Sequence, residues 1–316
     1  MRPVPVPRVR RAARWIAVGV VTVVTAASAA ACSTAPTASA GGSSRTIQVV
    51  AAENFWGSIA SQLGGSRAKV TSIINNPAAD PHDYEPTAAD ARTFAGARYT
   101  VVNGIGYDAW ASKLLAASAG NDRTDLNVGD LLGIKPGGNP HRWYSPADVH
   151  TVIGKITDDY KAIDPADAAY FDQQRTTYEK TTLAPYEKLV AGIKAKYAGT
   201  PIGASESIVS PLAEQLGLRM LTPVGFLNAI SEGSDPVAAD KAAIDQQIAT
   251  GQIKVYVFNS QNATPDVRAQ VAAAKAKGIP VATVTETLTP AGATFQDWQV
   301  HQLQAIEQAL ATAARR

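Results

Sequence analysis

Two histidines held in proline-bounded loops are the residues of this chain best placed to do chemistry. Histidine is rare here, with four among 316 residues. His82 lies in the motif DPHDYEP at residues 80–86, and His141 lies in the motif NPHRWYSP at residues 139–146. Because proline fixes its own φ and favours extended backbone in the preceding residue, both loops are stiff and non-helical. Stiffly held imidazoles in a histidine-poor chain predict metal ligands.

Two carboxylates stand apart from the other acidic residues. Glu206 and Glu286 each follow a β-rich stretch directly, whereas most other acids lie in segments with helical spacing. Ligands of α/β proteins gather at the carboxyl ends of parallel strands, where the loops converge. Successive members of the set of two histidines and two glutamates lie 59, 65 and 80 residues apart. Sequence spacing alone therefore does not show that the four side chains meet.

Strands alternate with helices along the chain, which predicts parallel sheets in an α/β architecture. Apolar β-rich stretches predict strands at residues 46–52, 70–74, 99–102, 201–204, 220–221, 255–258 and 281–284. His82 and Asn103 each follow one of these stretches, so we expect both at the edge of the sheet that binds ligands. Gly104 and Gly106 lack the third glycine of a dinucleotide-binding fingerprint, so this pair does not predict a phosphate site.

The chain is long enough for two hydrophobic cores. Its composition, 46% hydrophobic and 18% charged, is typical of a globular protein. Helical spacing from Asp164 to about Tyr197 contains Pro185, which predicts either one kinked helix or two successive helices. We expect a first lobe at residues 46–158, a linking helix at 159–198 and a second lobe at 199–316.

Residues 1–31 have the pattern of an export signal. They contain five arginines and no acidic residue, then an apolar run from Trp15 to about Val24, then small residues before Cys32. This run is shorter than the roughly 20 apolar residues of a comfortable membrane span, so we expect cleavage. The sequence AAAC at residues 29–32 resembles a bacterial lipobox, which predicts acylation of Cys32. The alternative is an ordinary signal peptide followed by a stray cysteine.

The residues after the leader exclude several functional classes. Residues 32–45 are small and polar, which predicts a flexible, lipid-anchored tether. Cys32 is the only cysteine, so the chain has neither an intramolecular disulfide nor a cysteine-based zinc site. Without the five arginines of residues 1–31 the formal charge is −3 instead of +2. A mildly acidic chain with no basic block is not typical of nucleic-acid binding.

Taken together, these motifs resemble the substrate-binding proteins of zinc and manganese ABC importers. The resemblance rests on the lipoprotein leader, both histidine motifs, the motif VNGxG at residues 102–106, the long central helix, ASE at 204–206 and TET at 285–287. It implies an α/β fold of two Rossmann-like lobes with parallel sheets, joined by a long rigid helix, with the metal in the interlobe cleft. The implied metal ligands are His82, His141, Glu206 and Glu286.

The resemblance also implies a cargo and partners. Neutral imidazoles and carboxylates suit zinc, manganese and ferrous iron. A donor set with two carboxylates favours manganese or iron. Zinc ranks above both in intrinsic affinity, so the choice between Zn²⁺ and Mn²⁺ stays open. The expected partners are an ABC permease and, indirectly, its ATPase. We expect a monomer without enzyme activity, lipid-anchored to the outer face of the cell membrane.

Two other functions are compatible with such a donor set. An exported metal-dependent hydrolase could use two histidines and two carboxylates while leaving a position open for water. The chain lacks a His-Glu-x-x-His motif, and GASES at residues 203–207 fails the nucleophile-elbow pattern, which disfavours this reading. The other alternative is a metal-binding surface adhesin. His150 and His301 lie in predicted helices and Asn259 follows a strand; none of the three is predicted to bind the metal.

Overall fold

The first lobe of the protein is built on a parallel sheet. The computed structural model of the 316-residue chain describes residues 46–77, 84–118 and 122–316. The strands of the first sheet lie in the order β2-β1-β3-β4 and are all parallel. Their bounds are β1 (Ile47–Glu53), β2 (Ala68–Ile74), β3 (Tyr99–Val102) and β4 (Thr124–Asn127). Strand β4 was not predicted from the sequence, because Leu126 is its only apolar residue.

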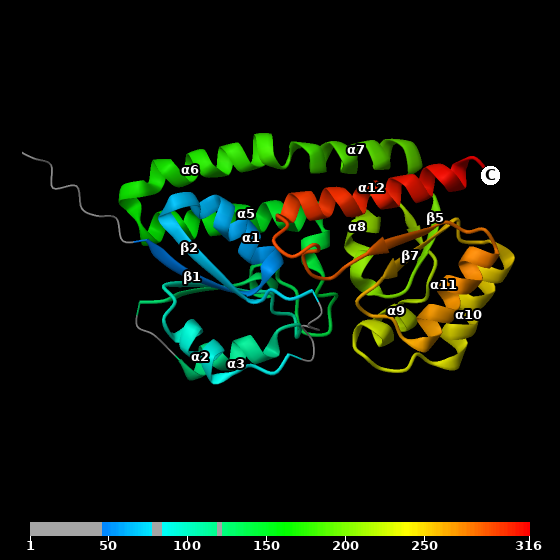
Figure 1. The fold of residues 1–316 in the computed structure, drawn as a ribbon, viewed down its shortest axis with the longest axis horizontal. Helices are drawn as coiled ribbons and strands as arrows, with labels where there is room; N and C mark the ends of the chain where they lie inside the picture. The colour runs from blue at the N-terminus through cyan, green and yellow to red at the C-terminus, as the bar shows by residue number, and fades with distance from the viewer. Residues whose placement is uncertain (1–45, 78–83, 119–121) are drawn as a thin grey trace, which may run out of the picture. The chain divides into compact units, whose positions relative to one another are not determined.

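Helices cover both faces of this sheet (Figure 1). One face packs against α1 (Asn54–Gly64) and α5 (Pro146–Ile163), and the other packs against α2 (Ala88–Ala95) and α3 (Ala109–Ala117). The short helix α4 (Val128–Leu132) follows β4. Because all four strands are parallel, their carboxyl ends and the loops after them share one edge of the sheet.

The second lobe repeats the plan with a parallel sheet in the order β6-β5-β7-β8. The strands are β5 (Pro201–Ala204), β6 (Arg219–Met220), β7 (Val255–Asn259) and β8 (Val281–Val284). The helices are α8 (Ser210–Gln215), α9 (Val224–Ser231), α10 (Ala238–Thr250), α11 (Pro265–Ala276) and α12 (Phe295–Ala314). Helix α9 was not predicted from the sequence. The expected α/β class with two parallel-sheet lobes is confirmed.

The segment between the lobes is a pair of helices joined by a wider turn. Helix α6 (Ala168–Thr177) leads into a π-helical turn (Tyr178–Thr182), and α7 (Ala184–Tyr197) follows along the same side of the molecule (Figure 1). Pro185 lies in the first turn of α7, where its missing N–H is tolerated. Leu183 N–H reaches the Tyr178 carbonyl five residues back. Of the two expectations for this segment, the structure has two successive helices.

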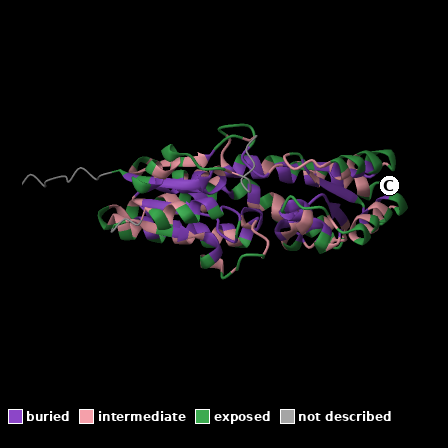
Figure 2. Ribbon diagram, turned by 90° about the horizontal axis from the view of Figure 1, so that it is seen from below, coloured by how far each residue is buried: buried purple, intermediate pink, exposed green. Residues whose placement is uncertain are grey.

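One hydrophobic core runs through both lobes and the connecting helices. It includes Phe55 and Trp143 in the first lobe, Tyr186 in α7, and Val255 and Trp298 in the second lobe, all at most 1% exposed. Helix α12 packs along α7 and also contacts α1. Buried residues accordingly lie in the interior of each half, while exposed residues lie along the outer helices (Figure 2). The shared core restrains the two sheets relative to each other.

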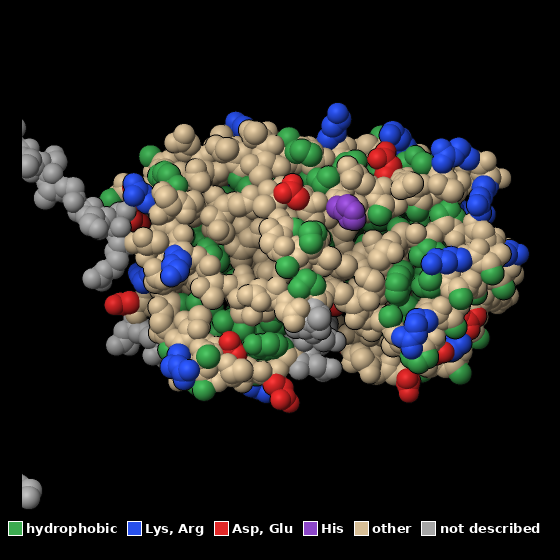
Figure 3. Space-filling model, viewed as in Figure 1, with side chains coloured by type: hydrophobic (Ala, Val, Ile, Leu, Met, Phe, Trp, Pro, Cys, Tyr) green, Lys and Arg blue, Asp and Glu red, His purple; other side chains and the backbone are tan. Residues whose placement is uncertain are grey.

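The surface carries dispersed charge. On the face shown in Figure 3, Lys and Arg side chains are scattered among Asp and Glu, and most of the face is uncharged. Among the helices that the structure describes, none combines the length and hydropathy that a membrane span requires.

Two buried acids lie at the carboxyl end of the first sheet. Glu53 ends β1 and is fully buried. Burial raises its pKa well above the usual value, and the neighbouring Asp108 carboxyl raises it further. Asp108 accepts hydrogen bonds from the backbone N–H groups of Asn103 (2.6 Å) and Gly104 (2.8 Å). Burial nevertheless raises the pKa of Asp108 to about 6. Glu53 is therefore held as the neutral acid over a range in which an exposed glutamate is ionised.

We expect the substitution Glu53→Gln to stabilise the metal-free protein increasingly as the pH rises. A raised folded-state pKa means that the folded protein binds a proton that the unfolded chain has already released. The stability of the wild type therefore falls as the pH rises from about 4.3, the usual glutamate pKa, toward the folded-state pKa. Glutamine does not titrate. The free energy of unfolding from urea denaturation, variant minus wild type, should be larger at pH 8 than at pH 5.

Glu214→Gln provides a matched control because Glu214 is exposed on α8. Its difference from wild type should be the same at both pH values. An equally constant difference for Glu53→Gln would show that Glu53 is ionised in the folded protein.

Candidate metal site

His141 is buried and its ring is fixed by Asn139. The Asn139 amide nitrogen donates to the Ser207 carbonyl (2.8 Å), which turns its oxygen toward His141. That oxygen accepts from His141 N–H (2.9 Å) and lies 3.0 Å from Nδ1. An amide oxygen only accepts, so Nδ1 carries the hydrogen in the neutral ring. Nε2 is then the unprotonated nitrogen, the form that binds metals.

Asn103 holds the loop that carries His141. Its amide nitrogen donates to the Pro140 carbonyl (3.0 Å), and its oxygen accepts from the Trp56 indole (3.0 Å). Asn103 is fully buried directly after β3, at the sheet edge where the sequence placed it. The His141 ring also meets Trp143 edge-on, with centroids 5.2 Å apart, and Trp143 stacks on Phe55 at 3.8 Å. The imidazole is therefore positioned from several sides.

His141 and Glu286 meet although they lie in different lobes. Nε2 of His141 is 3.3 Å from Oε1 of Glu286. Both residues are buried, at 0% and 5% exposure. Two electron-pair donors at this distance in a buried site require a proton or a cation to stabilise them. The structure thus brings together two of the predicted ligands, one from each lobe.

The Glu286 loop is held through its backbone. Gln261, in the loop after β7, accepts hydrogen bonds from the N–H groups of Glu286 and Thr287 with its side-chain oxygen. On the other side, the Tyr144 hydroxyl lies 2.8 Å from the Thr285 carbonyl, and the Gln302 oxygen accepts from Thr285 N–H. These contacts fix the direction in which Glu286 leaves its strand.

Two asparagines orient Glu206. It lies after β5 and is 1% exposed. The Asn259 amide donates to its Oε1, and the Asn262 amide donates to its Oε2 at 2.9 Å. Neutral amide donors fix a carboxylate without cancelling its charge, so the carboxylate keeps its attraction for a cation. Asn259 thus donates a hydrogen bond to a predicted ligand, in agreement with its place at the carboxyl end of a strand.

Glu206 is linked to His141 through its neighbour in the chain. The next residue, Ser207, places its hydroxyl 3.3 Å from Nδ1 of His141. Burial raises the pKa of Tyr144 well above its usual value, and the charges of Glu286 and Glu206 raise it further. Across residues 46–77, 84–118 and 122–316, however, no three His, Cys, Asp or Glu side chains form a group that could hold a metal ion. His82 lies outside these residues, as does Cys32.

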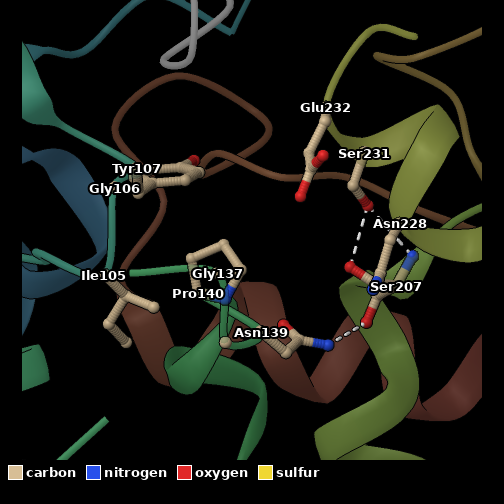
Figure 4. Close-up of a pocket in the computed structure, with 11 residues that line it drawn as sticks. Ile105, Gly106, Tyr107, Gly137, Asn139, Pro140, Ser207, Asn228, Ser231 and Glu232 are labelled. Atoms are coloured by element: carbon tan, nitrogen blue, oxygen red, sulfur yellow. Dashed lines mark hydrogen bonds between the residues drawn. The ribbon is translucent and has the colours of Figure 1, made fainter. Parts of the chain in front are cut away.

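A cavity of about 220 Å³ reaches the hydrogen bonds on the Nδ1 side of His141. Both lobes line it: Tyr107, Asn139 and Pro140 come from the first, and Ser207 and Glu232 come from the second. Figure 4 shows the Asn139 amide directed at Ser207 and the Glu232 carboxylate directed into the cavity. The Ser207 hydroxyl also lies 2.8 Å from that of Ser231. The cavity therefore borders the groups that orient the imidazole.

The other described histidines lie away from this site. His150 in α5 is hydrogen-bonded to Glu187 in α7 (2.8 Å), and this bond raises its pKa. His301 is exposed on α12.

Four residues that position the predicted ligands were not predicted from the sequence: Asn139, Ser207, Gln261 and Asn262. Asn139 stands inside the NPH motif, and Gln261 and Asn262 belong to the run NSQN after β7. An amide-rich run at the carboxyl end of a strand is a signal that could have indicated them. Ser207 carries no comparable signal, because its contact with His141 bridges 66 residues.

Comparisons with known proteins identify sequence relatives of this chain and solved structures with a similar fold. The zinc-binding lipoprotein AdcA of Streptococcus pneumoniae is 26% identical over 275 residues, which cover 78% of this chain and 52% of the relative. The manganese-binding lipoprotein MntA of Halalkalibacterium halodurans is 26% identical over 135 residues, covering 42% of this chain and 45% of the relative. The chain thus spans about half the length of the curated relatives it matches.

A solved structure has the same fold. The Mn-bound periplasmic metal binding protein of Candidatus Liberibacter asiaticus matches with a TM-score of 0.69 at 21% identity, over 84% of this chain and 99% of that one. Residues 49–309 match the family described as zinc-uptake complex component A, periplasmic. The match covers both lobes and confirms the resemblance seen in the motifs: this chain belongs to that family.

Proposed function

We propose that this protein captures one divalent transition metal ion, zinc or manganese, outside the cytoplasm and delivers it to an ABC-type import permease. Membership in a family described as a component of an uptake complex supports import over the hydrolase and adhesin alternatives. The names of the relatives, a zinc-binding and a manganese-binding lipoprotein, support a metal cargo. The proposed ligands are His82, His141, Glu206 and Glu286.

The contact between His141 and Glu286 carries this proposal. Metal bonds to imidazole nitrogen and carboxylate oxygen are about 2.0–2.2 Å long, so neighbouring ligands of one ion lie about 3.0–3.5 Å apart. The observed separation between Nε2 and Oε1 is 3.3 Å. With Nδ1 carrying the hydrogen, the two facing atoms are both electron-pair donors. A cation bound by both would turn their repulsion into attraction.

The charge of the site suits a dication. Glu206 and Glu286 would supply two negative charges, which neutralise a divalent ion in a buried site, and the imidazoles bind in their neutral form. We extend the proposal to localisation: Cys32 would be acylated and would hold the protein at the outer face of the cell membrane as a monomer. The permease would receive the metal, with its ATPase acting indirectly.

The double substitution His82→Ala with His141→Ala should abolish metal binding. Removing two of four ligands leaves two carboxylates that compete poorly with water for the ion. Metal content after equilibration with Zn²⁺ or Mn²⁺ and desalting, measured by mass spectrometry, should fall from one ion per chain to none.

His301→Ala is the control, because His301 is exposed on α12 and should leave metal content unchanged. Full occupancy of the double variant would refute the ligand assignment.

Bound metal should be released on acidification through about pH 6 to 5. Histidine binds a metal only as the neutral imidazole, so protons compete with the ion below the usual histidine pKa of about 6.5. Affinity measured with a metal-sensitive dye at stepped pH should fall steeply in this range. An affinity that stays constant down to pH 4 would argue against histidine ligands.

Zn²⁺ should displace Mn²⁺ from protein that has been loaded with Mn²⁺. Zinc ranks above manganese in intrinsic affinity for nitrogen and oxygen donors, and none of the proposed donors excludes it. Competitive titration, followed by the paramagnetic signal of released Mn²⁺, measures the ratio of the two affinities. Retention of Mn²⁺ against an equal concentration of Zn²⁺ would show that the site geometry overrides the intrinsic order.

A further inference from the structure

Gln261 contacts the backbone of a proposed ligand directly. It lies in the loop after β7, and its side-chain oxygen accepts from Glu286 N–H and from Thr287 N–H, the latter at 3.0 Å. These two N–H groups belong to a loop rather than to a strand or helix, so the Gln261 oxygen replaces the partners that regular structure would provide.

The nitrogen of the same side chain reaches the first lobe. Nε2 of Gln261 donates to the carbonyl of Pro77, shortly after β2, and to the Thr287 hydroxyl at 2.8 Å. One amide therefore joins the Glu286 loop of the second lobe to the first lobe. Its two ends have opposite hydrogen-bonding character, which a glutamine provides and an ionised glutamate does not.

The backbone of Gln261 connects to the other proposed carboxylate ligand. Its N–H donates to the Asn259 oxygen at 3.0 Å, and the Asn259 nitrogen donates to Glu206. The end of β7 and the loop after it thus contact both proposed carboxylate ligands, Glu206 and Glu286, and supply none of the proposed ligands themselves.

We propose that Gln261 is a positioning residue for metal capture, which fixes Glu286 relative to the first lobe. The inference rests on the proposed function and deepens it. Without the two acceptor contacts, the Glu286 backbone would lose its fixed orientation. Without the Pro77 contact, the loop would lose one of its hydrogen bonds across the lobes, and the ion would have to order this part of the loop as it binds.

The test compares Gln261→Met with Gln296→Met. Gln296 in α12 and Gln62 in α1 form a reciprocal amide pair, at 3.0 and 2.9 Å, which also joins the two lobes but belongs to no ligand loop. The two variants therefore remove similar interlobe contacts with the same change of side chain. Isothermal titration with Zn²⁺ gives the affinity, and stopped-flow chelation gives the rate of metal release.

We expect Gln261→Met to weaken Zn²⁺ binding about 10-fold, mainly through faster release, since each lost hydrogen bond accounts for a severalfold change. Gln296→Met should stay within about twofold of the wild type. The melting temperatures of the two metal-free variants should be similar. Equal affinities for Gln261→Met and the wild type would refute the inference.

A second comparison separates positioning from a general structural effect. In the Glu286→Gln background, Gln261→Met should weaken Zn²⁺ binding much less than in the wild type, because the residue through which it acts no longer binds as a carboxylate. The same 10-fold loss in both backgrounds would overturn the inference. Failure of the wild type to bind Zn²⁺ and Mn²⁺ would instead refute the proposed function itself.

Discussion

Nε2 of His141 and Oε1 of Glu286, buried and 3.3 Å apart, form the contact on which the site depends. Such a pair is unfavourable in a low-dielectric interior unless a proton or a cation lies between or beside its members. The surrounding side chains nevertheless hold the two residues at this distance. Asn139 sets the tautomer of His141, and Gln261 holds the backbone of Glu286. Both are amides, which orient their partners without adding charge to the site.

The contact also requires the two lobes to keep their relative position. His141 and Glu286 are 145 residues apart and follow different sheets. The stacked pair Phe55 and Trp143 lies under His141, and the same hydrophobic core continues into the second lobe through α12. A close-packed core of this kind resists small displacements, because each shift opens cavities or creates overlaps. The precision of the site is therefore a property of the shared core as much as of the loops.

The sequence predicted the architecture better than the site. Alternating apolar strands and amphipathic helices are local patterns, so seven strands and most helices could be read directly; the polar edge strand β4 could not. The position of Glu53 was likewise not evident from the local sequence pattern. In the sequence it resembles the first residue of a helix, but it completes β1 and is fully buried. The positioning roles of Asn139 and Gln261 depend on partners 68 and 184 residues away, which no local pattern encodes.

The same geometry bears on the choice of metal. Nitrogen and oxygen donors alone favour zinc over manganese, so a preference for manganese would have to arise from the arrangement of the donors. Here both oxygens of Glu206 already accept a hydrogen bond, and the Glu286 backbone is held on both sides of its strand end. Carboxylates held in this way cannot easily rearrange from one coordination number to another. Selectivity would therefore reside in the amide-rich loop at residues 259–262, which sets the spacing of the carboxylates, more than in the identity of the ligands.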